Sequence, residues 1–263
     1  MERAVYVVGF PWEEKSTLRR GTALGPWAIR RELLDWLAVP TGLAARLPIV
    51  DLGVVRLSRD ESAFSEMGAV VRKILPHGVP AVLGGDHSLT LPVVRAVADF
   101  HGPVDVLWID RHADLYPDFF GDRYSHACVA ARLLEAGTIR RLVQLGVREV
   151  SDAEREQQRQ WGVTWSADPQ AELLPRSGPL YVTVDLDVLN PDFAPGASLG
   201  MSGGWSPEEL LDLLSKIQGE VVGFDVVELN PRLDRSRRTA RVAAEVVKKL
   251  LGKVAVPREA VAP

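Results

Sequence analysis

Short apolar runs alternate with longer amphipathic stretches along almost the whole chain, and this alternation constrains the fold most. The runs rich in Val and Leu have the length of buried strands and cover residues 5–9, 49–53, 81–85, 104–110, 142–147, 180–187 and 221–228. Stretches with helical spacing lie between them, at residues 26–37, 62–75, 91–100, 129–135, 207–217 and 239–251. Strands that alternate with helices predict a parallel sheet covered by helices. We therefore expect an α/β protein with three α/β/α layers around a mostly parallel sheet of roughly eight strands.

The clearest helix start is the sequence Ser206-Pro207-Glu208-Glu209. A Ser cap, a Pro at the first helical position and a Glu three residues after the cap form a capping box. Residues 151–177 are polar enough to predict a long excursion from the alternating pattern. No repeat or Gly/Ser linker divides the chain, so residues 1–263 are expected to form one domain whose last residues, 257–263, fray.

Composition excludes several classes of protein. The net charge of −4 gives no basic field, and no run of Lys and Arg with interleaved aromatic residues predicts a nucleic-acid partner. No apolar stretch approaches the roughly 18 residues that a membrane-spanning helix needs. The single cysteine, Cys128, forms no internal disulfide and opens an apolar helical stretch, where it is expected to pack as a small hydrophobic residue. These features predict a soluble cytoplasmic protein.

Acidic and imidazole side chains gather at the ends of four of the predicted strands. They are Asp86 and His87, then Asp110, His112 and Asp114, then Asp185 and Asp187, and finally Glu228. One such residue alone is more often a solvated carboxylate or a helix cap. Ligand sites in open α/β sheets form beyond the carboxyl ends of the strands, so eight such residues at four strand ends predict a common site.

The spacing within two of these segments suits metal binding. In an extended chain alternate side chains face the same way, which places Asp110, His112 and Asp114 on one side and pairs Asp185 with Asp187. Carboxylates mixed with imidazoles, without sulfur, favour Mn²⁺ or a similar divalent ion. Two such ions about 3.5 to 4 Å apart can share a water molecule and lower its pKa towards neutrality. The segments therefore predict a dinuclear metallohydrolase.

An ordered set of motifs resembles the ureohydrolase family, which includes arginase, agmatinase and guanidinobutyrase. The matching segments run from the N-terminal to the C-terminal part of the chain: Gly25-Pro26-Trp27-Ala28-Ile29-Arg30, Gly84-Gly85-Asp86-His87-Ser88, Asp110-Arg111-His112-Ala113-Asp114, Asp185-Leu186-Asp187, Ala194-Pro195-Gly196 and Asp225-Val226-Val227-Glu228-Leu229-Asn230-Pro231. One Asp-x-His would be weak evidence, whereas the ordered set is specific.

The resemblance implies an arginase-like sheet and a role for each residue of the site. One metal would be held by His87, Asp110, Asp114 and Asp185, and the other by His112, Asp110, Asp185 and Asp187, with Mn²⁺ as the expected ion at both. A hydroxide would attack the guanidinium carbon while Asp114 passes a proton to the leaving amine. Glu228 would pair with the guanidinium group. His126 resembles the proton-shuttle histidine of the family, with a helix-capping histidine as the alternative.

Departures from the family pattern concern the substrate. Arginases carry an Asn-containing segment before the shuttle histidine and an Asp where this chain has Ser151. Here residues 122–125 read Asp-Arg-Tyr-Ser, which resembles agmatinases, so agmatine, hydrolysed to urea and putrescine, is the expected substrate. Arg111 or Arg123, if either faced the pocket, would favour guanidinobutyrate or formiminoglutamate, and arginine is the further alternative. Strand alternation predicts that Arg111 points away from the metals, towards a nearby acid or a subunit contact.

Two functions from other classes compete with this hypothesis. A deacetylase on a related sheet also uses an Asp-x-His pair, but the second Asp-x-Asp and the complete Gly-Gly-Asp-His favour two metals. A homologue that binds ligand or metal without catalysis is the other alternative, for which Arg111 and the altered segment after Gly196 are the only indications. The family resemblance also implies a homotrimer or homohexamer.

Overall fold

In the part of the chain that the structure describes, eight parallel strands form a single sheet at the centre. The computed structural model describes residues 4–17, 19–38, 48–197 and 202–254. The strands are β1 (Ala4–Gly9), β2 (Ile49–Val54), β3 (Gly78–Leu83), β4 (Val104–Ile109), β5 (Ile139–Leu145), β6 (Thr164–Ser166), β7 (Pro179–Asp185) and β8 (Glu220–Val227). Their order across the sheet is β2-β1-β3-β8-β7-β4-β5-β6.

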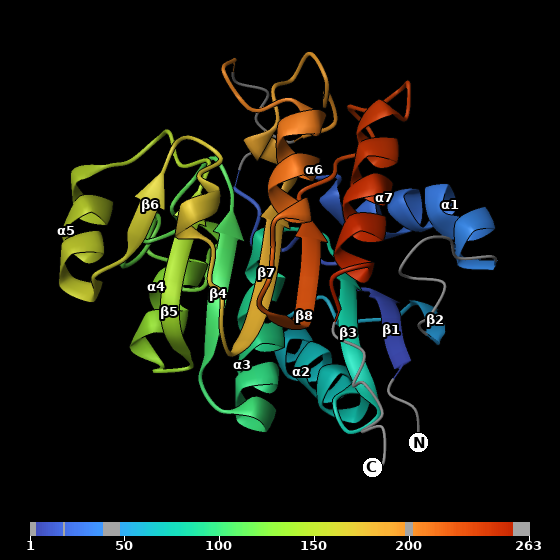
Figure 1. The fold of residues 1–263 in the computed structure, drawn as a ribbon, viewed down its shortest axis with the longest axis horizontal. Helices are drawn as coiled ribbons and strands as arrows, with labels where there is room; N and C mark the ends of the chain where they lie inside the picture. The colour runs from blue at the N-terminus through green and yellow to red at the C-terminus, as the bar shows by residue number, and fades with distance from the viewer. Residues whose placement is uncertain (1–3, 18, 39–47, 198–201, 255–263) are drawn as a thin grey trace, which may run out of the picture.

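Helices cover both faces of the sheet, as a parallel sheet requires (Figure 1). The helices are α1 (Gly25–Ala38), α2 (Ser62–Ile74), α3 (Thr90–His101), α4 (Val129–Glu135), α5 (Asp152–Trp161), α6 (Pro207–Ser215) and α7 (Arg238–Leu251). The helices α1, α6 and α7 pack together on one face, while α2, α3 and α4 pack on the other. The short helix α5 lies beside the edge strand β6. The three-layer α/β/α prediction is confirmed.

The pleat of the central strands divides the apolar core into two layers. In β4, Leu107 and Ile109 face the layer that contains α1, α6 and α7, whereas Val106 and Trp108 face the opposite layer. All four side chains are buried completely. Burial of each stabilises the fold by about 1.5–3 kcal/mol, so the strand is held from both sides.

The expected strands and helices are present, but one polar segment was predicted wrongly. Residues 151–177 contain the helix α5 and the strand β6 in place of a long excursion. Ser151 caps α5, and its hydroxyl and Glu154 form a reciprocal capping box. The helix is difficult to find from apolar spacing because Glu154 is the one residue of α5 that is buried.

The strands that end in the expected site residues are neighbours in the sheet. They are β3, β8, β7 and β4, in that order. Their carboxyl ends therefore meet at one edge of the sheet, the position at which ligands bind in open α/β sheets. The predicted fraying of residues 257–263 lies outside the described part of the chain.

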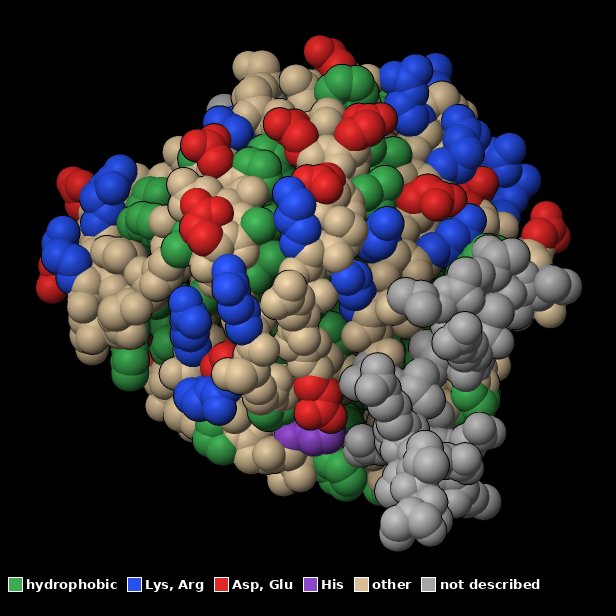
Figure 2. All heavy atoms as spheres, in the orientation of Figure 1, with side chains coloured by type: hydrophobic (Ala, Val, Ile, Leu, Met, Phe, Trp, Pro, Cys, Tyr) green, Lys and Arg blue, Asp and Glu red, His purple; other side chains and the backbone are tan. Residues whose placement is uncertain are grey.

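The surface over α6 and α7 carries interspersed charges of both signs (Figure 2). Hydrophobic side chains appear on this face as small separate areas between them. Within the described ranges, no helix combines the length and apolar character that crossing a bilayer demands.

Candidate metal centre and active site

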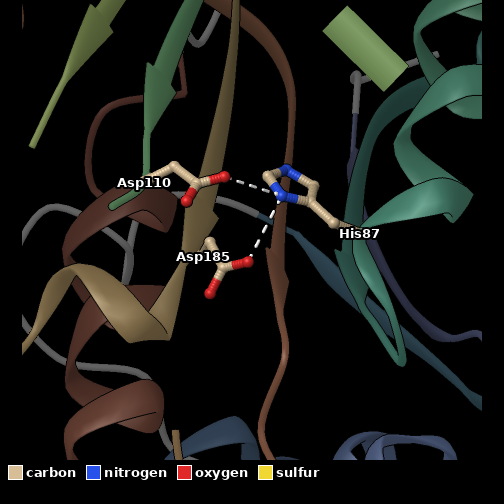
Figure 3. Close-up of side chains that lie close together, drawn as sticks. All are labelled: His87, Asp110 and Asp185. Carbon is tan, nitrogen blue, oxygen red and sulfur yellow. Dashed lines mark ion pairs between the residues drawn. The ribbon is translucent and has the colours of Figure 1, made fainter. Parts of the chain in front are cut away.

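Two groups of side chains that could each hold a metal ion share Asp110. The first consists of His87, Asp110 and Asp185, all buried, and Figure 3 shows the two carboxylates directed at the same ring nitrogen of His87. His87 Nδ1 lies 3.0 Å from Asp110 Oδ2 and 3.3 Å from Asp185 Oδ2. Asp114 Oδ2 approaches the same nitrogen at 3.3 Å. Four side chains from three strand ends thus converge on one point.

The second group consists of Asp110, His112 and Asp187. His112 Nδ1 lies 3.0 Å from Asp187 Oδ2 and 3.5 Å from Asp110 Oδ1. The two carboxylate oxygens of Asp110 therefore face different histidines, an arrangement in which this carboxylate could bridge two ions. The structure therefore brings all six expected ligands together. Asp185, however, lies close to the ligand atoms of the first group only, so the structure does not place it between the two groups as Asp110 is placed.

The polar groups around His87 fit a divalent cation. His87 Nδ1 is buried and makes no hydrogen bond of normal geometry, although three carboxylates face it. Burial alone would lower the pKa of His87, but Asp110, Asp185 and Asp114 raise it well above its ordinary value. Such a concentration of buried carboxylates needs positive charge, and a hard divalent ion supplies it without a proton.

The turns that follow the strands aim these side chains. Asp110 Oδ1 accepts a hydrogen bond of 2.6 Å from the backbone N–H of His112. In the same way Asp185 Oδ1 accepts one of 2.8 Å from the N–H of Asp187. Aspartate side chains form such local turns readily, and in both residues the second carboxylate oxygen, Oδ2, faces His87 Nδ1. The repeated Asp-x-ligand pattern is therefore a structural device as well as a chemical one.

A chain of buried hydroxyl groups supports His87 from behind. Its Nε2 lies 2.8 Å from Thr183 Oγ1, and Thr183 in turn donates to Asp225. Asp225 is fully buried and also accepts hydrogen bonds from Tyr181, at 2.6 Å, and from Thr90, at 2.9 Å. Partners of this kind fix the orientation of an imidazole ligand.

Trp108 supports the same group of ligands from β4. Its Nε1 donates to Asp110 Oδ2 at 2.9 Å, and its ring stacks on that of His87 with centroids 4.2 Å apart.

His126 and Glu228 lie together at the edge of the candidate centre. His126 Nδ1 is 3.4 Å from Glu228 Oε1, and the same oxygen accepts a hydrogen bond of 2.9 Å from the backbone N–H of His87. Burial alone would lower the pKa of His126, but the Glu228 carboxylate raises it to about 9. Glu228 has a φ of 65°, in the left-handed region that a residue of this type rarely adopts. The backbone is therefore constrained at a residue of the candidate site.

A pocket of about 350 Å³ opens over these groups. Its floor contains His112, Asp114, Asp185, Asp187 and Glu228, and its walls contain Thr17, Tyr116, Phe119, His126, Ala127, Glu149, Val150, Ser151 and Glu154. No Lys or Arg is among these described lining residues. The wall residues Thr17, Tyr116, Phe119 and Glu154 escaped sequence reasoning, because only the fold brings them beside the strand ends.

Arg111 and Arg123, which could have paired with the carboxylate of an acidic substrate, are not among the residues that line this pocket. Arg111 Nε pairs with Glu149 Oε1 at 2.6 Å, so the expected nearby acid is Glu149. Arg123 pairs with Glu135 at 2.8 Å and has a half-exposed side chain. Part of the altered segment after Gly196, residues 198–201, lies outside the described residues, but Ser202 accepts a hydrogen bond from Arg111.

Cys128 does not act as a nucleophile in this arrangement. Its side chain is fully buried, and burial raises the pKa of its thiol to about 12. A thiol of this kind is not ionised at neutral pH, which agrees with its packing role.

Comparison with known proteins places this geometry in a family. The model of the Arginase family matches residues 3–252. The chain belongs to the arginase family. Members of the family hydrolyse C–N bonds in linear amidines, so this arginase-family protein is a hydrolase acting on guanidino-type groups. The deacetylase alternative is thereby set aside.

Relatives with several different substrates resemble this arginase-family protein. Arginase 1, mitochondrial, of Arabidopsis thaliana is 37% identical over 276 aligned positions, which cover 94% of this chain and 80% of the relative. The structure of proclavaminate amidino hydrolase from Streptomyces clavuligerus has a TM-score of 0.87 at 31% identity, covering 96% of this chain and 92% of that chain. A hypothetical agmatinase from Burkholderia thailandensis has a TM-score of 0.84 at 28% identity, covering 95% and 85%. The similar structures thus include a hypothetical agmatinase, whereas the plant sequences at 36–37% identity are arginases.

Proposed function

We propose that this arginase-family protein releases urea from a guanidino compound whose tail carries a second positive charge, with agmatine as the preferred substrate. The observation that carries the proposal is the charge of the pocket. Acidic side chains lie on its floor and on its walls, and its described lining includes no Lys or Arg that could pair with a carboxylate tail, while its two histidines, His112 and His126, face carboxylates of the site.

Six side chains are proposed to hold two Mn²⁺ ions: His87, Asp110, His112, Asp114, Asp185 and Asp187. Bound divalent ions would supply Lewis-acid activation of water for hydrolysis. The donor set supports this assignment because it combines carboxylates with imidazoles and contains no sulfur.

The remaining residues are proposed to bind the guanidinium group and to move protons. Glu228 lies on the floor of the pocket, where its carboxylate would pair with the planar guanidinium and orient it. Asp114 lies beside the metal ligands and would pass a proton to the leaving amine. His126, partnered by Glu228, would exchange that proton with solvent.

Glu154 is proposed to bind the charged end of the substrate tail. It lines the wall of the pocket and is only 2% exposed. One carboxylate oxygen accepts hydrogen bonds of 2.9 Å from the N–H and the hydroxyl of Ser151. No Lys, Arg or His within the described ranges forms an ion pair with it. A buried carboxylate without a cationic partner favours a cation in the pocket.

Arginine is the second candidate, because plant relatives with 35–43% identity are arginases. Its α-amino group could use the same acidic wall. Its carboxylate, however, would find hydroxyl groups such as those of Thr17 and Ser151, and no Lys or Arg, among the described lining residues.

The test is urea release by Mn²⁺-loaded protein from agmatine, arginine, guanidinobutyrate and guanidine, with ammonia and formamide release measured for formiminoglutamate. We expect the highest kcat/KM for agmatine. A higher kcat/KM for guanidinobutyrate would contradict the proposal that the substrate has a positively charged tail. A higher kcat/KM for arginine would show that the pocket binds an amino acid.

A matched pair of variants tests the tail site. Glu154→Gln should lower kcat/KM for agmatine by about tenfold, because it removes the charge of one buried ion pair. Glu156→Gln on the same helix is the control, since the Glu156 side chain is 66% exposed. Equal effects of the two changes would contradict the role of Glu154.

A further inference from the structure

The segment before α1 contacts the residue that we propose moves protons. Thr17 Oγ1 lies 3.0 Å from His126 Nε2, and both residues line the pocket. The other ring nitrogen of His126 faces Glu228. The imidazole is thus held at both nitrogens, by a carboxylate from β8's end on one side and by a hydroxyl from the N-terminal segment on the other.

A hydroxyl group suits an imidazole that changes its protonation state. With Nδ1–H directed at Glu228, a neutral ring has a bare Nε2 that accepts a hydrogen bond from the Thr17 hydroxyl. When the ring is charged, Nε2–H donates to the oxygen of the same hydroxyl. Thr17 can therefore keep the ring in one orientation in both states, which a donor-only ammonium group or an acceptor-only carbonyl group could not do.

The segment that carries Thr17 is itself fixed to the strand end before His87. Trp12 Nε1 donates to Ser88 Oγ at 2.9 Å. The backbone N–H of Lys15 donates to Asp86 Oδ2 at 3.0 Å, and the N–H of Asp86 donates back to the carbonyl of Trp12 at 2.8 Å. The position of Thr17 is therefore tied to the same turn that places His87 in the candidate metal centre.

Lys15 joins this segment to the loop that carries His126. Its Nζ lies 2.9 Å from Asp122 Oδ2, four residues before His126, and 3.3 Å from Glu61 Oε1. The Lys15 side chain is only 12% exposed, so this ammonium lies between two loops and is not a freely solvated group. Asp122 in turn accepts a hydrogen bond of 2.7 Å from the N–H of Tyr124, which shapes the loop leading to His126.

We propose that Thr17 and Lys15 are positioning residues for His126, with Thr17 holding the imidazole directly and Lys15 holding its loop through Asp122. This inference rests on the proposed role of His126. Neither residue touches the candidate metal ligands, so we expect substitution of either residue to lower kcat and to leave the affinity for metal unchanged.

The test compares Thr17→Val, which keeps the branched shape, with Thr17→Ser, which keeps the hydroxyl. We expect Thr17→Val to lower kcat about three- to tenfold, the value of one hydrogen bond, with KM and Mn²⁺ affinity unchanged. Thr17→Ser should restore most of the lost kcat. A Thr17→Ser variant as slow as Thr17→Val would overturn the role of the hydroxyl.

A double-mutant cycle separates this inference from the proposed function. In a His126→Asn background, Thr17→Val should have no further effect on kcat, because its partner is absent. If the Thr17→Val loss persists in that background, the positioning role is overturned. If His126→Asn alone leaves turnover unchanged, the proposed role of His126 fails as well.

Lys15→Met, which keeps the length of the side chain but removes its charge, tests the second part. It should lower kcat about two- to fivefold, and Asp122→Asn should have no additional effect in the Lys15→Met background. Lys216→Met is the control, since Lys216 pairs with Asp212 on the exposed side of α6. Additive losses in the Lys15 and Asp122 pair, or an equal loss in the control, would overturn the role of Lys15.

Discussion

At the scale of single residues, site residues could be predicted from the sequence when the contacts that position them are between residues close together in the chain. Asp110, His112 and Asp114 could be found because the spacing that aims them is local. Thr183 and Asp225 could not be assigned to His87, because the contact between His87 and Thr183 spans 96 residues and exists only in the folded sheet. The wall residues Thr17 and Glu154 escaped for the same reason. Sequence patterns thus identify candidate metal ligands, and they miss the supporting and pocket-lining residues that reach the site only when the chain is folded.

Asp185 is the proposed metal ligand whose charge we expect to affect metal binding most clearly. Asp185→Asn removes one buried carboxylate charge from the first metal group, so we expect loss of Mn²⁺ from that group and loss of urea release. Circular dichroism should show an unchanged fold. Asp212→Asn, at an exposed position on α6, is the control. Near-normal turnover of Asp185→Asn would refute the dinuclear assignment.

Thr183 allows a test of the support behind His87. Thr183→Val removes the hydroxyl between His87 Nε2 and Asp225 and should weaken Mn²⁺ binding about tenfold. It should also lower the free energy of unfolding by about 1–3 kcal/mol, because Asp225 loses one buried donor. Calorimetric metal titration and urea denaturation measure the two effects. Thr183→Ser should recover the affinity, and an unchanged affinity in Thr183→Val would contradict the orienting role.

At the scale of elements, the structure follows the apolar patterns except where a helix is stabilised by a polar residue. The helix α6 begins where the capping box at Ser206 predicts. The helix α5 has a similar capping box at Ser151, but its sequence is strongly polar and Glu154 alone is buried. Apolar spacing therefore found α6 and missed α5, although the Ser-x-x-Glu signal was present in both.

The two capping boxes offer a matched comparison. Ser206→Ala and Ser151→Ala should each lower the free energy of unfolding by about 0.5–2 kcal/mol, measured by urea denaturation. Only Ser151→Ala should also raise KM for a guanidino substrate, because Ser151 and its partner Glu154 line the pocket. A similar change in KM for both variants would show that the α5 cap has no specific role in binding.

At the scale of the whole molecule, the candidate metal centre joins three strand ends that are far apart in sequence. His87 follows β3, Asp110 follows β4 and Asp185 ends β7, so one ion held there would contact three separate parts of the chain. The strand order could not be derived from the sequence, because the apolar runs carry no signal for which strand neighbours which. Metal binding should therefore report on the integrity of the entire sheet.

Metal should stabilise the protein in a way that depends on pH. At a Mn²⁺ concentration about 100 times Kd, the gain is about 2.7 kcal/mol, which corresponds to a rise in Tm of roughly 5–11 °C. Burial would lower the pKa of His87 and His112, but the neighbouring carboxylates raise both, so bound metal must displace protons. The rise in Tm should shrink from pH 8 to pH 6. Calorimetry with and without chelator measures it, and an equal rise at both values would exclude proton displacement.

The separation between the sheet and the pocket walls has a consequence for what a substitution can change. The proposed ligands stand on strand ends or in the turns directly after them, whereas the walls come from the segment around Thr17, the loop from Tyr116 to His126 and the segment from Glu149 to Glu154. A substitution at a wall residue such as Phe119 or Glu154 therefore changes the surface that a substrate would meet and leaves every strand of the sheet as it is. His126 is the exception among the wall residues, because its proposed role ties that position to the reaction as well as to the substrate.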